Sequence, residues 1–137
     1  MSAPDFSLTL THRAGGTAVL VLAGELDLYR VPELEHALAE AIERQAAQEG
    51  NGNQDPLRVF GGHISDPGVS RVVVDLRAVT FLDSTTLALL LAASGRLRAR
   101  RGELLILVGP QTPMTAFEAT GFDRLLAIKH VRDEAPA

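Results

Sequence analysis

The stretch 78–91, AVTFLDSTTLALLL, decides how this chain folds. The apolar strand before it is predicted to end at Leu76, and a turn through 80–82 leads into a helix that begins near Asp83. The start of a helix presents unpaired backbone N–H groups and the positive end of the helix dipole. A hydroxyl held there, such as that of Ser84, either caps the helix or carries a phosphate group. The function depends on which of these two roles Ser84 has.

The segments around this stretch predict a strand–helix–strand unit. Residues 71–76, RVVVDL, are typical of a central buried strand, and 103–108, with LLILV at its centre, of the next one. The helix between them is predicted to run to about Arg101, where Gly102 stops it. Two strands joined by a helix in this way are expected to be parallel neighbours with a right-handed crossover.

Two strands and a helix are predicted before this unit. Residues 6–11 alternate apolar and polar side chains, which predicts a half-buried edge strand. The pair Gly15-Gly16 favours a tight turn, and 17–23, TAVLVLA, is apolar throughout, as in a strand buried on both faces. Gly24-Glu25-Leu26-Asp27 is predicted to end that strand. Apolar residues spaced by three and four then predict an amphipathic helix over 31–44.

The remaining segments are less regular. Residues 45–70 are rich in Gly, Asn, Asp and Pro and predict a long flexible insertion. Thr112 is expected to cap a short helix over 113–120 that Gly121 ends. Residues 125–131 are either a short edge strand or the lead-in to a terminal helix. Together these segments predict a small α/β domain, with a mixed sheet of four or five strands covered by helices mainly on one face.

Composition narrows the class of protein. The chain has 137 residues, enough for a single domain over 1–137, and a net charge of -4, which does not favour a nucleic-acid partner. It has no cysteine and no apolar run long enough for a membrane span or a signal peptide, so we expect a cytoplasmic protein with no membrane partner. A basic cluster is interpreted as the solvated end of a helix: Arg96, Arg98, Arg100 and Arg101.

The residue patterns that catalysis requires are missing from the sequence. The histidines are scattered without metal-ligand spacing, so no metal site is expected. Ser84 lacks the flanking glycines of a hydrolase nucleophile, and Asp83 next to it is poorly placed to act as its base. No glycine-rich phosphate loop is present. We therefore predict a protein that is not an enzyme, with no catalytic residue and no cofactor.

Three motifs occur in a fixed order along the chain. Gly24-Glu25-Leu26-Asp27 follows the second strand, Phe81-Leu82-Asp83-Ser84 opens the helix after the central strand, and 113–122 supplies a closing Pro…Phe…Gly-Phe element. In this order they resemble the signature of the STAS domain, the fold of the anti-sigma factor antagonists. The resemblance covers nearly the whole chain except 45–70.

The resemblance implies a phosphorylation switch. In such antagonists the serine after the aspartate, here Ser84, is phosphorylated by an anti-sigma factor, a kinase of the histidine-kinase-like ATPase type, and a serine phosphatase resets it. The unphosphorylated form binds the anti-sigma factor and frees a sigma factor, while the phosphorylated form does not bind. The residues implied at the partner contact are Asp27, Asp83, Ser84, Thr85 and Thr86. We expect a monomer or weak dimer.

One departure from the family pattern concerns the positions after this serine. Family members commonly have Ser-Gly where this chain has Thr85-Thr86, which adds bulk at the docking surface and offers Thr85 as an alternative acceptor. On the residues alone, Ser84 is a plain helix cap and the two aspartates are cap or turn carboxylates. Two other functions stay open: a STAS scaffold subunit of a stress-sensing or transport-associated complex without a switch, and a nucleotide-binding or enzymatic domain.

Overall fold

The computed structural model of the chain describes residues 6–53 and 71–132. Strands and helices alternate after an initial β-hairpin, and two short 3-10 helices, η1 and η2, accompany them. In chain order the elements are β1 (Ser7–Arg13), β2 (Thr17–Leu26), η1 (Leu28–Arg30), α1 (Val31–Asn53), β3 (Arg71–Leu82), α3 (Ser84–Arg98), β4 (Glu103–Val108), α4 (Thr115–Thr120), η2 (Phe122–Arg124) and β5 (Ala127–His130).

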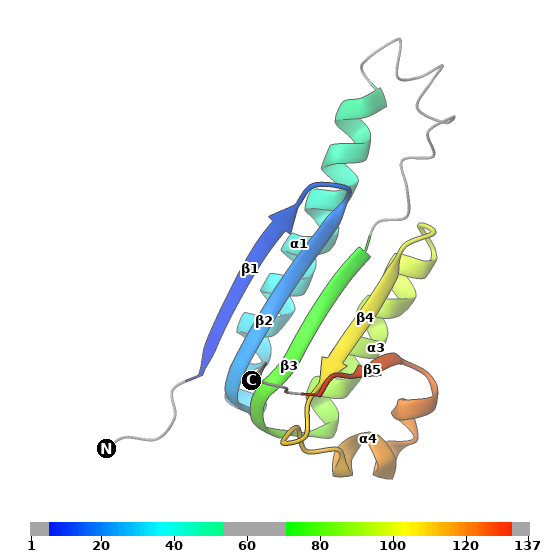
Figure 1. The fold of residues 1–137 in the computed structure, drawn as a ribbon. Helices are drawn as coiled ribbons and strands as arrows, with labels where there is room; N and C mark the ends of the chain where they lie inside the picture. Colours follow the sequence, from blue (N-terminus) through cyan, green and yellow to red (C-terminus); the bar gives the residue numbers. More distant parts are fainter. Residues whose placement is uncertain (1–5, 54–70, 133–137) are drawn as a thin grey trace.

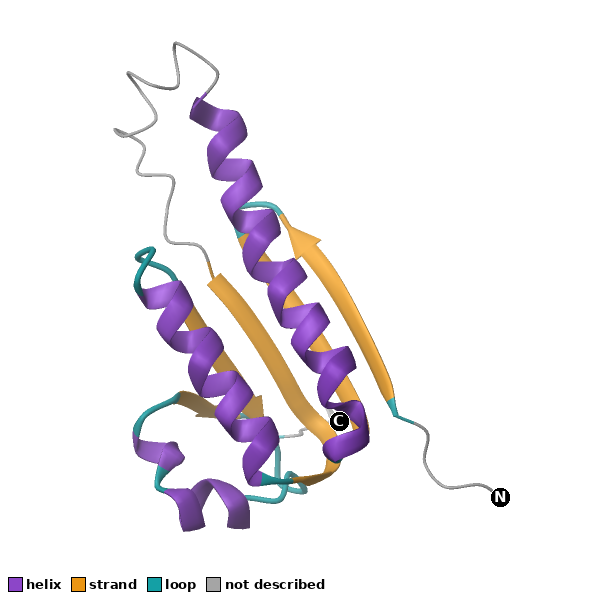
Figure 2. Cartoon of the chain, turned by 180° about the vertical axis from the view of Figure 1, so that it is seen from behind, coloured by secondary structure: helices purple, strands orange, loops and turns teal. Residues whose placement is uncertain are grey.

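One five-stranded sheet organises the domain, in the order β1-β2-β3-β4-β5 (Figure 1). β1 and β2 are antiparallel, and the other neighbours are parallel. Helices α1 and α3 lie on one face of the sheet, and no described helix covers the opposite face (Figure 2). This confirms the predicted α/β domain with a mixed sheet covered on one side.

The core lies between the sheet and these two helices. Its largest fully buried side chains come from every layer: Phe117, Leu20, Leu22, Leu26, Leu34, Leu76, Leu87, Leu90, Leu97, Leu104, Ile106 and Val72. The predicted edge strand near the N-terminus is confirmed as β1, and β5 settles the open choice at 125–131 in favour of a strand. None of the described helices is both long enough and apolar enough to cross a membrane.

The second strand differs from its prediction in burial and in length. Its burial alternates, because Leu20 and Leu22 face the helices while Val19 and Val21 lie on the uncovered face. The expectation of burial on both faces is therefore wrong: the continuous apolar run hides a strand with one open side. The strand also continues to Leu26, so the Gly-Glu-Leu-Asp segment extends it and does not end it.

The central strand, β3, is also longer than predicted. β3 does not end at Leu76 but pairs with β2 as far as Leu26↔Leu82. It has twelve residues against ten in β2, and two shifts in the pairing register accommodate the extra residues. Such bulges keep a strand paired past a point where its local pattern fails. The predicted turn through 80–82 is therefore strand.

The ends of two predicted helices also move. α1 reaches Asn53, so residues 45–53 of the predicted loop are helical, and 54–70 lie outside the described residues. α3 ends at Arg98 and not at Arg101; Arg101 itself takes the left-handed conformation, with φ 65°, and the Gly102 N–H donates to the Leu97 carbonyl. Glutamine and alanine at 45–48 are good helix formers, which explains the first of these errors.

The predicted cap of the short helix is wrong as well. α4 begins at Thr115, and Thr112 lies before it, buried in the loop that follows β4 and bonded to β3. The Thr112 hydroxyl donates to the Leu76 carbonyl at 3.0 Å and accepts from the Gly109 N–H at 2.8 Å. Gly121 does end the helix, in the left-handed conformation with φ 78°, as predicted.

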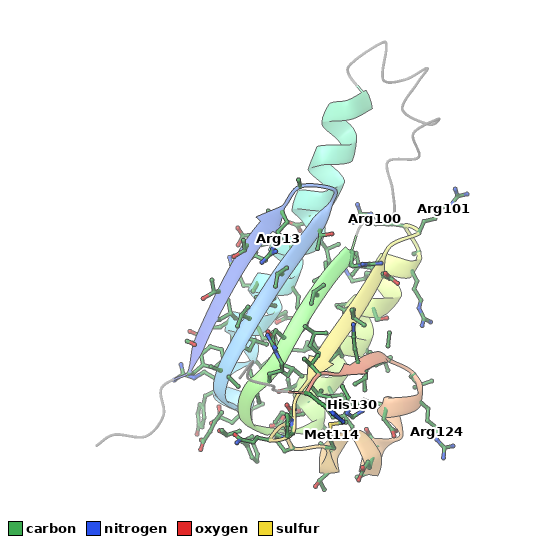
Figure 3. All side chains as sticks on the ribbon, in the orientation of Figure 1. Arg13, Arg100, Arg101, Met114, Arg124 and His130 are labelled. Atoms are coloured by element: carbon green, nitrogen blue, oxygen red, sulfur yellow. The ribbon has the colours of Figure 1, made fainter. Side chains whose placement is uncertain are left out.

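The predicted basic cluster lies at the end of α3 and in the turn after it. Arg96, Arg98 and Arg101 are exposed, as expected for a solvated helix end. Arg100 is half-buried, and its Nη1 donates to the Ile42 carbonyl of α1 at 3.1 Å. Figure 3 shows Arg100 and Arg101 at the same end of the molecule as Arg13, away from the start of α3.

Candidate functional site

The ends of β2 and β3 bring two of the three sequence motifs together. Leu26 pairs with Leu82, so the residues that follow them, Asp27 and Asp83, leave neighbouring strands at the same end of the sheet. Asp27 caps η1, because its carboxylate accepts from the Tyr29 N–H at 3.0 Å. The expectation that this carboxylate is a cap is confirmed.

Asp83 has the equivalent position before α3. Its Oδ1 accepts from the Thr86 N–H at 3.0 Å, so Asp83 is the N-cap of the helix. Ser84 is the first residue inside the helix and does not cap it. Its plain interpretation as the helix cap is therefore wrong, because the aspartate before it already has that role.

Thr86 is buried beneath the start of α3, with 1% of its surface exposed. Its Oγ1 lies 3.2 Å from the Leu26 carbonyl oxygen and 3.0 Å from Asp83 Oδ1. The hydroxyl has one hydrogen and donates to one of these acceptors at a time. Thr86 therefore joins the helix to the end of β2 and adds no bulk to the surface, contrary to expectation.

Ser84 and Thr85 are both exposed in the first turn of α3. Within the described residues, neither hydroxyl makes a hydrogen bond. Both are therefore accessible to a kinase, and a phosphate group on Ser84 would lie at the positive end of the α3 dipole. Of the sites implied by the sequence, these two are the accessible hydroxyls and Thr86 is not.

An exposed apolar cluster adjoins this helix start. Leu28 is 63% exposed, Tyr29 85% and Phe81 46%, and they account for three of the five large apolar side chains that are exposed among the described residues. Leu28 and Tyr29 follow Asp27 in η1, and Phe81 pairs with Glu25 beside it. A concentration of exposed apolar side chains is typical of a protein interaction surface.

Sequence reasoning did not identify this apolar cluster. Phe81 falls in a predicted turn, and Leu28 and Tyr29 lie between two predicted elements where no period marks a buried face. The one available signal was the position of a large aromatic residue, Tyr29, two places after the Gly-Glu-Leu-Asp motif.

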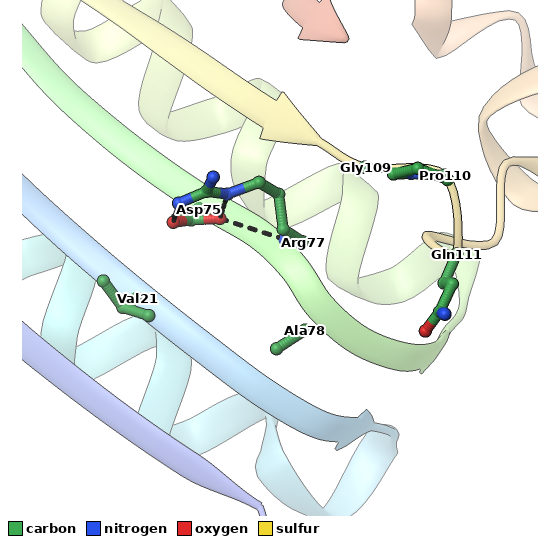
Figure 4. Close-up of a pocket in the computed structure, with 7 residues that line it drawn as sticks. All are labelled: Val21, Asp75, Arg77, Ala78, Gly109, Pro110 and Gln111. Carbon is green, nitrogen blue, oxygen red and sulfur yellow. Dashed lines mark hydrogen bonds and ion pairs between the residues drawn. The ribbon is translucent and has the colours of Figure 1, made fainter. Parts of the chain in front are cut away.

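A second polar cluster lies on the uncovered face of the sheet (Figure 4). Asp75, 8% exposed, accepts three hydrogen bonds from Arg77: from the backbone N–H and Nε at 3.0 Å and from Nη2 at 2.8 Å. Gly109 leaves room for this arginine, since a Cβ there would lie 3.3 Å from Arg77 Cγ. A cavity of about 350 Å³ beside the pair is lined by Val21, Asp75, Arg77, Ala78, Gly109, Pro110 and Gln111.

The electrostatics of this pair explain how a carboxylate is retained there. Burial alone would raise the pKa of Asp75, but the hydrogen bonds and the charge of Arg77 outweigh burial and lower that pKa below its ordinary value. The carboxylate therefore stays charged and paired near neutral pH. Nothing in the sequence analysis singled it out, although an aspartate inside the apolar run VVVDL was a visible signal.

The described residues bring no three His, Cys, Asp or Glu side chains together in a group that could hold a metal ion. The carboxylates of Asp27 and Asp83 each accept a hydrogen bond from a backbone N–H of the turn that follows, so both act as caps. The site therefore combines exposed hydroxyls at a helix start with exposed apolar side chains from the neighbouring segments.

Comparison with known proteins identifies relatives of this chain. The family model described as the STAS domain matches residues 9–135. The Anti-sigma-B factor antagonist of Listeria monocytogenes is 28% identical over 130 residues, which cover 95% of this chain and 94% of the relative.

Solved structures show the same fold. The unphosphorylated anti-sigma factor antagonist SpoIIAA matches with a TM-score of 0.64 at 20% identity, over 91% of this chain and 88% of that one. The phosphorylated form of SpoIIAA, a Bacillus cell fate determinant, matches with a TM-score of 0.56 at 19% identity, over 91% of each chain.

Proposed function

We propose that this chain, which belongs to the STAS domain family, is an anti-sigma factor antagonist whose binding is switched off by phosphorylation of Ser84. The observation that carries the proposal is the division of roles at the start of α3: Asp83 caps the helix, which leaves the adjacent Ser84 hydroxyl exposed. The similarity to the Listeria antagonist and the existence of SpoIIAA in two phosphorylation states support it.

The proposed docking surface joins the polar and apolar parts of the site. It consists of seven residues at the ends of β2 and β3 and the start of α3: Asp27, Leu28, Tyr29, Phe81, Asp83, Ser84 and Thr85. Thr86 is left out of it because its side chain is buried. The apolar members provide the area that a partner desolvates, and the hydroxyl lies beside them.

A phosphate group on Ser84 changes this surface without unfolding it. It adds about -1.5 to -2 charges near pH 7, and the start of α3 accommodates negative charge. A partner docked over the apolar cluster would have to desolvate that charge close to Asp83. A loss of about 2.8 kcal/mol in binding corresponds to a hundredfold loss of affinity.

The proposed partner is an anti-sigma factor of the histidine-kinase-like ATPase type, which phosphorylates Ser84, and a serine phosphatase restores the binding form. In this scheme the chain supplies a binding surface and a phosphate acceptor in the cytoplasm, and the chemistry belongs to the two enzymes. Thr85 is the alternative acceptor, because it is the other exposed hydroxyl of the same turn.

Capture from a lysate of the source organism with ADP present tests this proposal, with wild type, Ser84→Ala and Ser84→Asp as baits. A histidine-kinase-like ATPase should bind the first two, and Ser84→Asp should retain it about a hundredfold less well. Thr115→Asp is the matched control, because it places the same charge in the exposed first turn of another helix, α4. It should bind like wild type.

Phosphorylation by the captured ATPase provides the second measurement. Wild type should be labelled with ATP and Ser84→Ala should not be; labelling of Ser84→Ala would move the site to Thr85. Equal capture by all baits would remove the switch at Ser84. Absence of any such ATPase, together with a large defined oligomer in size-exclusion chromatography, would favour the scaffold function.

A further inference from the structure

The two edges of the sheet differ in how well they are protected against pairing with another chain. β5 has four residues, and two of them, Lys129 and His130, are charged or titratable and exposed. β1 has seven residues and pairs with β2 in an unbroken register from Ser7↔Ala23 to Arg13↔Thr17. Natural edge strands are usually shortened, bulged or charged, because a regular edge recruits other strands. β5 follows this rule, whereas β1 has charged or titratable side chains only at its end, in His12 and Arg13, and leaves residues 7–11 unprotected.

No described element pairs with the outer edge of β1, which forms one border of the sheet (Figure 1). From Ser7 to Thr11 its side chains are hydroxyls and leucines, without charge or proline. Threonine is favoured in strands, so these residues suit a strand with neighbours on both sides. The edge therefore offers backbone N–H and C=O groups to an added strand.

A groove runs between β1 and α1 beside this edge. It has a volume of about 350 Å³; its apolar lining comes from Phe6, Leu8, Leu10 and Ala37, and its polar lining includes Glu33, His36 and Glu40 on α1. Phe6, Leu8 and Leu10 are only partly buried. An apolar side chain from an added strand would complete their burial.

The charge along this groove identifies the kind of occupant. Glu33 and Glu40 are exposed on α1 and line the groove; among the described residues, Arg30 lies 3.3 Å from Glu33, and His36 lies 4.0 Å from Glu40 and pairs with it only when protonated. Arg30 also lies 4.9 Å from the Phe6 ring centroid. A second copy paired antiparallel through β1 would bring two acidic α1 faces together, which like-charge repulsion opposes. A basic segment suits the groove better.

We propose that β1 and this groove bind an extended basic segment of another protein by strand addition. Its backbone bonds the β1 edge, one apolar side chain lies over Leu8 and Leu10, and basic side chains on either side reach Glu33 and Glu40. These glutamates are separated by about 10 Å along the helix, or about three strand residues. Residues i, i+2 and i+4 of a strand lie on one face, and i and i+4 are about 13 Å apart, so long basic side chains at these two positions can reach both glutamates around an apolar residue at i+2.

A titration with a designed peptide tests the proposal. Acetyl-TKTITKT-amide is added to the isotope-labelled full chain, and backbone amide shifts are followed by NMR. The peptide should bind saturably, with the largest shifts in β1 and at 33–40 of α1. The Glu33→Lys/Glu40→Lys variant should bind about tenfold more weakly, and the acidic peptide TETITET should not bind.

A matched control separates the groove from general electrostatic attraction. Glu35→Lys/Glu43→Lys makes the same change in net charge on the same helix, at exposed residues that do not line the groove, and should leave affinity unchanged. Equal weakening in both double variants would overturn the proposal, and so would shifts confined to the start of α3. A dimer of the free protein that Glu33→Lys/Glu40→Lys strengthens would identify a second copy as the occupant instead.

The test is independent of the switch at Ser84. Ser84→Asp should bind the basic peptide like wild type, because the groove involves β1 and α1 and not α3. Circular dichroism should show that both double variants fold, since the pairs lost with Glu33 and Glu40 are exposed on both sides.

Discussion

Two polar clusters, one in the middle of β3 and one at its end, are each built around an aspartate but differ in what they leave accessible. In the middle of the strand, both carboxylate oxygens of Asp75 accept hydrogen bonds from Arg77. At its end, Asp83 and Thr86 also bond inward, but Ser84 in the same turn is exposed. The first cluster is closed on itself, and the second leaves a hydroxyl accessible to a partner. Hydrogen bonding and burial, more than residue type, therefore separate a cluster that holds the fold from one that serves binding.

Removing Arg77 should have the largest effect on stability. Arg77→Leu removes both side-chain hydrogen bonds and the charge that face the buried Asp75 carboxylate, and leaves it only the backbone N–H of residue 77. We expect a loss of about 2–3 kcal/mol in the free energy of unfolding at pH 7, less than for a fully buried pair because Arg77 is 46% exposed. Urea denaturation monitored by circular dichroism measures this loss.

The pH dependence of this loss has a defined sign. In wild type the pKa of Asp75 is lowered, so its stabilising effect is present above its ordinary pKa, near 4, and is lost as the pH falls through the folded-state value. In Arg77→Leu the backbone N–H of residue 77 still donates to Asp75, but the side-chain hydrogen bonds and the charge are gone, so burial raises the pKa of Asp75 relative to wild type and the penalty is relieved as the pH falls. The difference between the two proteins should shrink from pH 7 toward pH 4.

Arg98→Leu provides the control for this experiment, because Arg98 is exposed at the end of α3 and its replacement should change stability by less than about 0.5 kcal/mol. If both arginine variants lost the same stability at pH 7, or if the loss in Arg77→Leu did not depend on pH, the closed cluster would not have the role assigned to it.

Variants at two neighbouring threonines, Thr86 and Thr85, compare a buried and an exposed hydroxyl at the second cluster. Thr86→Val keeps the shape of a buried side chain and removes the hydroxyl that bonds the Leu26 carbonyl and Asp83, which should cost about 1–2 kcal/mol. Thr85→Val makes the same chemical change at an exposed position one residue earlier and should be neutral within about 0.5 kcal/mol. Chemical denaturation of both variants measures the difference.

Thr86→Ser adds a rescue to this pair, because it restores the hydroxyl and should recover part of the stability lost in Thr86→Val. Equal stability of the two valine variants would mean that the link between α3 and β2 contributes nothing. These variants also test how the chain accommodates Thr86 where the family commonly has glycine, namely by burying the threonine side chain.

How far the fold could be predicted is clearest in β2 and β3. The apolar runs 17–23 and 71–76 located both strands, because continuous β-branched residues are distinctive. The same runs led to a wrong prediction of burial in β2, since a continuous apolar strand is expected between two layers of helices and the described helices form one layer. The length of β3 depends on pairing with Leu26 across the sheet, which no local pattern records.

The sequence predicted where the candidate site lies but not which of its residues are exposed and which are buried. The motif Phe81-Leu82-Asp83-Ser84 marked the helix start, which the structure confirms. Which hydroxyl is exposed and which is buried depends on Leu26, sixty residues from Thr86 in the chain, and that contact exists only after folding. The apolar side chains Leu28 and Tyr29 were missed because their exposure, and not their type, makes them informative.

The smallest predicted effect distinguishes the two residues at the helix start. Asp83→Ala removes the carboxylate that accepts from the Thr86 N–H and should cost about 1 kcal/mol, the usual cost of losing an N-cap. Ser84→Ala should be neutral within about 0.5 kcal/mol, because Ser84 lies inside the helix and alanine is the best helix former. Thermal unfolding compared at constant pH measures both. If Ser84→Ala were the costlier change, the serine would be the true cap, and the argument that its hydroxyl is available to a kinase would lose its structural basis.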